Sequence, residues 1–235
     1  MGKLRDQLMS AQAERETFEI RQAEIETRMS RADREISLTL LLCGIAAFYL
    51  AVRFGLTTRL DALGTYASYI FEIGLVILTA LILRPRLAWG SLIRLWPIAG
   101  ALVLLAAGFG IQKLARISGL TIPMNVSEGE TVLFLIVVAP ILEEFVFRFL
   151  LWKPIERATS AKTAWITTSL LFAYSHLHAI WFVPAEYQKF LIYQTAYTLP
   201  LGLACGWMLR KQNSLLPAIL LHFAFNLGFF LAFRF

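Results

Sequence analysis

Seven apolar runs follow one another along the chain, and each is close to the length that a helix needs to cross a bilayer. A hydrocarbon core of about 30 Å is crossed by about 20 helical residues. The runs cover residues 37–52, 63–83, 95–112, 131–152, 163–183, 190–209 and 215–233. Hydrophobic residues make up 58% of the chain and charged residues only 16%, which excludes a disordered protein and a typical water-soluble domain. The sequence therefore predicts an all-α, polytopic membrane helix bundle of about seven transmembrane helices, with six to eight crossings compatible with the run lengths.

The first 36 residues have a different composition, with seven basic and eight acidic side chains, so a domain boundary falls near Ser37. Within them, positions repeat at alternating spacings of four and three, and eight of the ten are apolar. This is the a/d pattern of a coiled coil. The positions are Leu4, Leu8, Ala11, Arg15, Phe18, Gln22, Ile25, Met29, Ala32 and Ile36. We therefore divide the chain into an N-terminal helix, residues 1–36, and a membrane-embedded domain, residues 37–235.

Two arrangements are compatible with this N-terminal helix. It can form a cytoplasmic coiled coil that joins two copies or recruits a partner protein, or it can be a lone amphipathic helix that docks on its own membrane domain. Its balanced charge argues against a basic helix lying on anionic lipid. No cleaved signal peptide is expected, because no short apolar segment with a small-residue cleavage site opens the chain.

Basic residues are distributed unevenly between the two sides of the expected membrane. With the N-terminus in the cytoplasm, 15 of the 22 Lys and Arg residues fall on the cytoplasmic side and six on the other. This agrees with the positive-inside rule and predicts a cytoplasmic N-terminus. The short loops are typical of a bacterial plasma-membrane protein. Because the net charge of +6 lies in such loops and not on one face of a soluble fold, we expect the lipid bilayer as a partner and no nucleic acid.

Ionisable side chains are rare inside the predicted spans, and each needs a partner or a task. Burying a charge in hydrocarbon costs about 2.5 to 3.5 kcal/mol or more. Glu72 stands alone in the second span and is interpreted as a helix–helix hydrogen bond. The fourth, fifth and seventh spans hold the remaining polar set: Glu143, Glu144, Arg148, His176, His178, His222 and Asn226. His178 lies close to the outer end of its span and is interpreted as a packing residue, as are Cys43 and Cys205 within their apolar runs.

The fourth span carries two adjacent carboxylates shortly after Pro140, a residue that removes a backbone hydrogen bond and is expected to bend the helix. Glu144 and Arg148 are four residues apart and can pair on one helix face. Glu143 points about 100° away round the helix, so it is expected to be unpaired and free for proton chemistry. In the alternative interpretation, Glu144 and Arg148 form a structural salt bridge and Glu143 has no role. That interpretation does not explain why two glutamates are present.

The fifth and seventh spans each carry a pair of side chains on one helix face. Phe172 can wall one side of the His176 imidazole, four residues away. His222 and Asn226 share a face in the same way. They offer two hydrogen-bond donors, or alternatively they form a structural polar contact between helices. At 1.5 Å per residue, the depths of Glu143, His176 and His222 agree to within a few residues. Three helices are therefore expected to meet around one polar cavity.

A carboxylate, two imidazoles and an amide in such a cavity are the parts of a hydrolase. Glutamate with histidine can deprotonate water, and histidine with asparagine can stabilise an oxyanion. Glu143, His176 and His222 could instead hold zinc, because one Glu and two His are the ligands of several catalytic zinc sites. The sequence lacks His-Glu-x-x-His, so spacing alone does not choose between the two mechanisms.

The same sequence excludes or disfavours several other functions and chemistries. No aspartate lies within an apolar run and there is no Gly-x-Ser-x-Gly motif, so two-aspartate and serine-elbow hydrolases are excluded. A non-catalytic membrane scaffold or bacteriocin-immunity protein acting through the N-terminal helix is the main alternative. A proton-coupled transporter is less favoured, because the sequence shows no evident internal repeat.

The order of the polar motifs resembles the CPBP family of intramembrane proteases, the group of CAAX proteases and bacteriocin-processing (Abi) proteins. The motifs are Glu143-Glu144-x-x-x-Arg148, Phe172-x-x-x-His176 and His222-x-x-x-Asn226, with Gly202-Leu-Ala-Cys-Gly206 and Arg210-Lys-Gln-Asn-Ser-Leu-Leu-Pro217 before the last of them. The resemblance covers about residues 120–233. The N-terminal helix and the first three spans lie outside it.

The resemblance implies that Glu143 and His176 activate the attacking water, and that His222 and Asn226 form the oxyanion hole. Glu144, Arg148 and Phe172 would support these groups. The implied activity is that of an intramembrane endopeptidase acting on a membrane-associated peptide or protein, either a prenylated CAAX protein or a leader peptide. The mechanism would be metal-free or use zinc. One departure is Phe149, where the family often carries a small residue.

Overall fold

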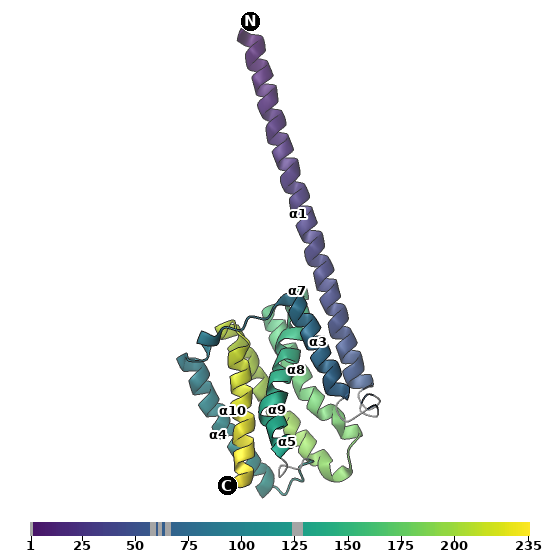
Figure 1. Cartoon of the computed structure of the whole chain (residues 1–235), viewed down its shortest axis with the longest axis vertical. Coiled ribbons are helices and arrows are strands. Elements are labelled where there is room, and N and C mark those ends of the chain that lie inside the picture. The colour runs from purple at the N-terminus through teal and green to yellow at the C-terminus, as the bar shows by residue number, and fades with distance from the viewer. Residues whose placement is uncertain (1, 57–59, 61–62, 64–66, 124–128) are drawn as a thin grey trace. The chain divides into compact units, whose positions relative to one another are not determined.

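A computed structural model describes residues 2–56, 60, 63, 67–123 and 129–235, with side chains described for residue 9 and for the described residues from 17 onward. The described residues form helices and no strand, which confirms the predicted all-α fold class (Figure 1). They divide into two compact units, Met1–Leu41 and Leu42–Phe235. Each unit is described by itself.

The first unit is part of one long helix, α1, which covers Gly2–Gly55. The chain has neither glycine nor proline between Gly2 and Gly44, so no residue in the first unit interrupts helical hydrogen bonding. The first predicted span, 37–52, is therefore the continuation of this helix. The predicted seam positions Leu4, Leu8, Ala11 and Arg15 lie outside the described side chains.

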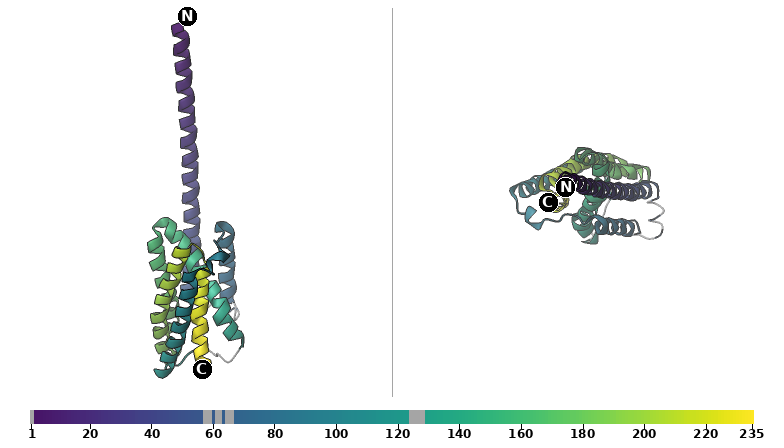
Figure 2. Two further views of the ribbon diagram at one scale, coloured as in Figure 1. Left: turned by 90° about the vertical axis from the view of Figure 1, so that its left-hand side faces the viewer. Right: turned by 90° about the horizontal axis from the view of Figure 1, so that it is seen from above.

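The second unit is a helical bundle whose long helices follow the order of the predicted spans (Figures 1 and 2). They are α3 (Ala67–Leu83), α4 (Leu95–Ile117), α8 (Ala161–Leu177), α9 (Ala185–Gln212) and α10 (Leu216–Arg234). Two short 3-10 turns, η1 (Trp89–Ser91) and η4 (His178–Trp181), lie in the connections. By length and composition, three helical stretches of the described chain could cross a membrane: Thr17–Gly55, Leu95–Ile117 and Leu216–Arg234. The shorter Ala67–Leu83 is also apolar.

The fourth predicted span is not one regular α-helix. It consists of α5 (Gly129–Leu133), the π-helical segment η2 (Phe134–Val138), α6 (Ala139–Phe145) and a second π-helical segment η3 (Val146–Leu150), and α7 (Trp152–Ala158) follows. Pro140 sits in the first turn of α6 and cannot donate a backbone hydrogen bond. The expected effect of this proline was a bend, and the structure shows a widened π turn directly before it. Such turns re-aim side chains and are frequent at functional sites.

Helices α4 and α10 pack side by side with their backbones in contact (Figure 1). A Cβ atom added at Gly108 of α4 would overlap the carbonyl of Phe225, and one added at Gly228 of α10 would overlap the carbonyl of Leu105. Small residues of this kind let membrane helices approach closely. This contact fixes the position of α10, the helix that carries His222 and Asn226.

The lone acid of the second span joins two helices, as predicted. The Tyr49 hydroxyl of α1 donates to Glu72 Oε1 of α3 at 3.0 Å, and Arg53 Nη1 lies 3.5 Å from the same oxygen. Arg53 lies just beyond the first predicted span, residues 37–52, but α1 extends to Gly55 and places Arg53 in its last turn. Both cysteines are free thiols, and Cys205 is fully buried in the core.

Candidate active site

One cavity of about 90 Å³ lies between α6, α8, α9 and α10, and it brings the predicted polar residues together. Glu143 comes from α6, His176 from α8, and His222 and Asn226 from α10. We call this space the active-site cavity. The structure thus gathers the four candidate catalytic residues from three separate segments, as the sequence predicted.

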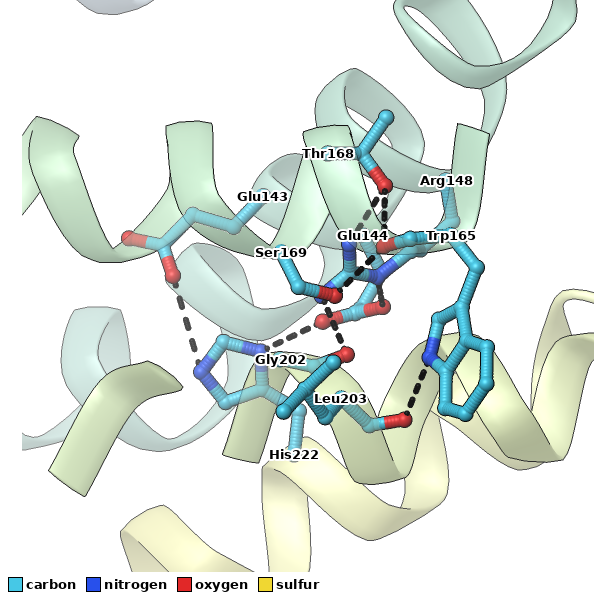
Figure 3. Close-up of polar contacts among 9 residues, drawn as sticks. All are labelled: Glu143, Glu144, Arg148, Trp165, Thr168, Ser169, Gly202, Leu203 and His222. Atoms are coloured by element: carbon cyan, nitrogen blue, oxygen red, sulfur yellow. Dashed lines mark hydrogen bonds and ion pairs between the residues drawn. The ribbon is translucent and has the colours of Figure 1, made fainter. Parts of the chain in front are cut away.

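His222 lies between the two carboxylates of α6, and Figure 3 shows this arrangement. Its Nε2 is 3.5 Å from Glu143 Oε2, and its Nδ1 is 2.9 Å from Glu144 Oε1. The prediction that Glu143 is unpaired is wrong, because α10 packs against α6 and brings the imidazole within ion-pair distance. Glu143 nevertheless remains accessible, with 30% of its side chain exposed against 1% for Glu144. The two carboxylates therefore occupy different environments.

Glu144 is part of a buried ion-pair network that extends across three helices. Arg148 Nε donates to Glu144 Oε2 at 3.2 Å, which confirms the predicted pairing. The other two guanidinium nitrogens donate to Thr168 Oγ1 at 3.0 Å and to the Gly202 carbonyl at 2.8 Å (Figure 3). A buried charge pair needs this degree of hydrogen bonding to offset its desolvation. Through Glu144, this network holds the Nδ1 atom of His222 in place.

The hydrogen bonds assign a role to each imidazole nitrogen. His176 Nδ1 lies 2.9 Å from the Phe172 carbonyl, and a carbonyl oxygen can only accept a hydrogen bond. Nδ1 therefore carries the proton, and Nε2 is left available for another contact. By the same argument, His222 Nδ1 donates to the ionised Glu144 carboxylate. Nε2 of His222 is the nitrogen that faces Glu143.

Asn226 is oriented by the irregular part of the fourth span. Its Nδ2 donates to the Leu135 carbonyl at 2.7 Å, and Leu135 belongs to the π-helical segment η2. An amide nitrogen carries two hydrogens, so this bond uses one and fixes the direction of the other. The π turn before Pro140 therefore contributes directly to the geometry of the cavity.

Phe172 contacts both imidazoles. Its ring centroid lies 4.9 Å from that of His176 and 5.5 Å from that of His222, with an interplanar angle of 79° in both pairs. The ring is fully buried and packs in turn against Phe147 at 5.2 Å. The predicted contact between Phe172 and His176 is thus present, and the same ring also restricts the rotation of the His222 imidazole.

Three polar residues of α9 also line the cavity and were missed from the sequence: Gln194, Tyr197 and Thr198. They are spaced as neighbours on one helix face, and this spacing was the available signal. The rest of the wall is apolar and aromatic, with Phe225, Phe229, Phe230 and Phe233 among its members. The cavity therefore joins a small polar centre to an apolar surface.

A second cavity, of about 80 Å³, lies on the other side of Glu143. Tyr49, Arg53 and Glu72 line it together with Glu143. The first two spans therefore bring charged side chains next to the candidate catalytic carboxylate. Sequence reasoning did not anticipate this neighbourhood, because neither span takes part in the recognised motifs.

Two residues singled out in the sequence lie away from the active-site cavity. The His178 ring packs 5.2 Å from Phe54 and 5.3 Å from Phe182, in agreement with its interpretation as a packing residue. Phe149 is 4% exposed and lies 6.3 Å from Phe145 in an edge contact. A large side chain at this position is therefore buried without lining the active-site cavity.

The residues suggested for zinc were tested on their arrangement. Among the described residues, no group of three or more His, Cys, Asp and Glu side chains is placed to hold a metal ion. A catalytic zinc site needs three protein ligands and one open position. Glu143 and His222 approach each other, whereas His176 does not complete a ligand group with them. The set does not fit zinc in this arrangement.

The fold and the site define an α-helical membrane protein with a polar cavity buried between its helices. Residues 129–228 match the family of type II CAAX prenyl endopeptidase Rce1-like proteins. These residues therefore form a Rce1-like domain of the CAAX protease class, which confirms the resemblance to the CPBP family. The matched segment contains all of the candidate site residues. Comparison with curated proteins and with solved structures gave no significant match.

Proposed function

We propose that this protein is an intramembrane endopeptidase that hydrolyses a peptide bond of a membrane-associated substrate. The observation that supports this activity is the convergence of Glu143, His176, His222 and Asn226 on one cavity. Its apolar aromatic wall suits a substrate that enters from the membrane, either a prenylated CAAX-type protein or an apolar leader peptide. The protein would lie in a bacterial plasma membrane with its N-terminus in the cytoplasm.

Glu143 and His176 are proposed to activate the attacking water. Glu143 is the more exposed of the two α6 carboxylates and is not committed to Arg148. His176 turns its Nε2 away from the bonded Phe172 carbonyl and can accept a hydrogen bond from the same water. The carboxylate takes one proton as the water oxygen attacks the substrate carbonyl carbon.

His222 and Asn226 are proposed to stabilise the oxyanion that forms. His222 can donate from Nε2 when both of its ring nitrogens carry hydrogen, and its Nε2 is the nitrogen that faces Glu143. Asn226 can donate its second amide hydrogen, because the first is held by Leu135. Donors that are already oriented toward the developing charge contribute most to such a step.

The step balances without a further reactant. The water oxygen forms the new carbon–oxygen bond, the carbon–nitrogen bond breaks, and the proton held by Glu143 passes to the leaving amine. The products are a carboxylic acid and an amine, and transfer of the remaining water proton from the acid to the amine gives a carboxylate and an ammonium group. Glu144 and Arg148 act as positioning residues, since Glu144 holds Nδ1 of His222, Arg148 holds Glu144, and neither lines the active-site cavity.

Reconstitution of the full chain in liposomes tests the proposal. A farnesylated CAAX peptide and an unprenylated apolar peptide serve as probes, and cleavage is followed by mass spectrometry. Glu143→Gln should lower cleavage by about a hundredfold or more, the usual contribution of a general base. Glu130→Gln is the control, because Glu130 is an exposed carboxylate at the start of the same span. Equal cleavage by wild type and Glu143→Gln would contradict the mechanism and favour a scaffold acting through the N-terminal helix.

A further inference from the structure

Helices α3 and α9 end, and α10 begins, at one end of the second unit (Figure 1). Basic side chains gather there. They surround a cavity of about 650 Å³, which we call the basic cavity. Its basic lining residues are Arg84, Arg86, Arg148, Lys153, Arg157 and Arg210. Glu156 is the one carboxylate among its described lining residues, and it bonds Lys153 Nζ at 2.8 Å. The lining therefore carries a strong excess of positive charge.

The basic cavity is separate from the active-site cavity. None of the four candidate catalytic residues lines it. Arg148 forms part of its wall, but the Arg148 guanidinium is bonded to Glu144, Thr168 and the Gly202 carbonyl. A ligand of the basic cavity would thus be distinct from the peptide substrate of the proposed function.

Two hydrogen bonds join the segment after α3 to the segment between α9 and α10. The Ser214 hydroxyl accepts from the Ala88 N–H at 3.1 Å, and the Leu215 N–H donates to the Arg86 carbonyl at 3.2 Å. Positive charge on cytoplasmic loops is general in membrane proteins and directs topology. That rule does not require cations from three segments to surround one hollow, so the arrangement calls for a ligand.

The backbone is left-handed at two lining residues. Arg84 has φ of 51° and Asn213 has φ of 49°, and both are non-glycine residues in the left-handed region. Asparagine visits this region readily, whereas arginine does so only rarely. Both residues directly follow a helix, Arg84 after α3 and Asn213 after α9, where a left-handed residue commonly ends the helix, so only the arginine is unusual.

The same end of the bundle has the features of a membrane–water interface. Lys211 Nζ lies 3.5 Å from the ring centroid of Trp96 and 4.6 Å from that of Trp207. Tryptophan and basic residues are enriched at headgroup depth. The basic cavity also has apolar walls, which include Trp152 and Leu209. Cations beside apolar walls match the chemistry of a phosphate group attached to a lipid.

We propose that the basic cavity binds the headgroup of an anionic phospholipid. Arg84, Arg86 and Arg210 would hold the phosphate, and the apolar walls would contact the glycerol and the first acyl carbons. Guanidinium groups bind phosphate oxygens in a fork geometry. Basic pockets between transmembrane helices on the cytoplasmic side bind anionic headgroups in this manner.

Lipid binding by the full chain in nanodiscs tests this proposal without an activity assay. Displacement of a fluorescent phosphatidylglycerol would be measured with phosphatidylglycerol and with phosphatidylcholine as competitors. The triple variant Arg84→Gln, Arg86→Gln, Arg210→Gln should lose at least tenfold in affinity for phosphatidylglycerol. The matched control removes three charges where α4 ends and α9 begins, by Lys113→Gln, Arg116→Gln and Lys189→Gln. The control should retain the wild-type affinity.

Three outcomes would overturn the assignment. The first is unchanged selectivity for phosphatidylglycerol in the triple variant. The second is displacement of the lipid by soluble glycerol phosphate at the same concentration, which would indicate a free phosphate ligand. The third is binding of an acidic peptide with no selectivity among lipids. If the triple variant does not fold, Arg84→Gln and Arg210→Gln singly should each weaken binding.

A second inference rests on the first unit alone. All side chains of residues 17–37 are exposed there. Phe18, Ile25, Met29 and Ile36 occupy the predicted a/d seam and are between 49% and 63% exposed. A row of exposed apolar side chains on a polar helix marks an interaction surface. The charges beside this seam identify what covers it.

In one arrangement of two identical helices, two of the three flanking pairs with a charge at both positions are complementary, and the third places Glu14 opposite Glu19 of the partner subunit. Arg21 and Arg28 precede seam positions, while Glu26 and Asp33 follow them. In a parallel, in-register pair, each g position faces the e position five residues further on in the partner. Arg21 then meets Glu26 of the partner subunit, and Arg28 meets Asp33 of the partner subunit. An antiparallel pair would place acidic positions against acidic ones.

We infer that a second copy of this chain covers the seam as a parallel coiled coil. Two copies inserted in one membrane with the same topology present their N-terminal helices on the same side, so a parallel pair needs no other partner. Gln22, a polar residue at a seam position, would fix the register. This inference is independent of the proposed catalysis.

Cysteine cross-linking in membranes tests the coiled coil. In a background with Cys43→Ser and Cys205→Ser, Ile25→Cys should form a disulfide-linked dimer, because paired seam positions lie within disulfide range. Thr27→Cys, on the outer face, is the control and should not. Arg21→Glu with Arg28→Glu should abolish the cross-link, and adding Glu26→Arg with Asp33→Arg should restore it. Equal cross-linking at Ile25 and Thr27, or no cross-link at either, would overturn the inference.

Discussion

The Nδ1 atom of His222 lies 2.9 Å from Oε1 of Glu144, so the second carboxylate of α6 holds an imidazole of α10. Glu144 is also bound to Arg148 and is almost fully buried. This contact leaves Glu143 as the carboxylate that faces the active-site cavity. The adjacent glutamates therefore have different tasks in the proposed mechanism: Glu144 orients, and Glu143 exchanges protons.

Replacement of His222 should remove activity, whereas replacement of His178 should not. His222→Ala deletes a proposed oxyanion donor, and loss of one such donor costs about a hundred- to a thousandfold in kcat. His178→Ala changes a histidine that packs among aromatic rings outside the cavity. Peptide cleavage by the reconstituted variants gives the comparison. Similar losses in both variants would show that the effect is not specific to the site.

Asn226→Ala should lower kcat by about a hundredfold with a smaller effect on KM, because an oxyanion donor acts mainly in the transition state. The same change removes the bond from Nδ2 to the Leu135 carbonyl. Thermal unfolding of the variant in detergent separates this structural effect from catalysis. A raised KM with an unchanged kcat would assign Asn226 to substrate binding instead.

Glu144→Gln should destabilise the fold by about 3 kcal/mol or more, because it leaves the buried Arg148 guanidinium without its counter-charge. Combining it with Arg148→Met should recover part of the free energy of unfolding, since an apolar side chain needs no partner there. Activity should not recover, because the neutral amide oxygen that then accepts from His222 Nδ1 lacks the negative charge of the Glu144 carboxylate. Reversible unfolding in mixed micelles and peptide cleavage would be measured on both variants.

Gly108→Ala should destabilise the packing of α4 against α10, because the new methyl group would overlap the Phe225 carbonyl. Overpacking of this kind costs about 1–3 kcal/mol or more when the backbone must shift. Gly110→Ala is the matched control in the same helix, since nothing lies within 4 Å of its added Cβ. Midpoints of thermal unfolding should fall for the first variant only. Equal midpoints would mean that the two helices can separate without cost.

Metal removal should leave peptide cleavage intact. The prediction follows from the donor arrangement, in which Glu143 and His222 lack a third nearby ligand among the described residues. Elemental analysis of the purified protein and cleavage after treatment with a zinc chelator provide the measurements. Stoichiometric zinc that is lost together with activity would show that His176 moves to complete a ligand set.

Much of the site could be read from residue spacing. The pairs Glu144 with Arg148 and Phe172 with His176 are four residues apart within one segment, and both contacts are present. Local helical geometry suffices for such predictions, because it depends only on the rise and turn of the backbone. The same is true of the apolar runs that became helices.

The contacts between segments could not be read in this way. The sequence by itself determined the all-α class, the order of the helices and which helix carries each candidate catalytic group. Packing of the helices in three dimensions established that His222 lies between Glu143 and Glu144, that α9 adds Tyr197 to the active-site cavity, and that cations from the loop after α3, from η3 and α7 and from α9 surround the basic cavity. The reason is that relative rotation and depth of helices are set by side-chain packing over the whole bundle, and no local periodicity encodes them.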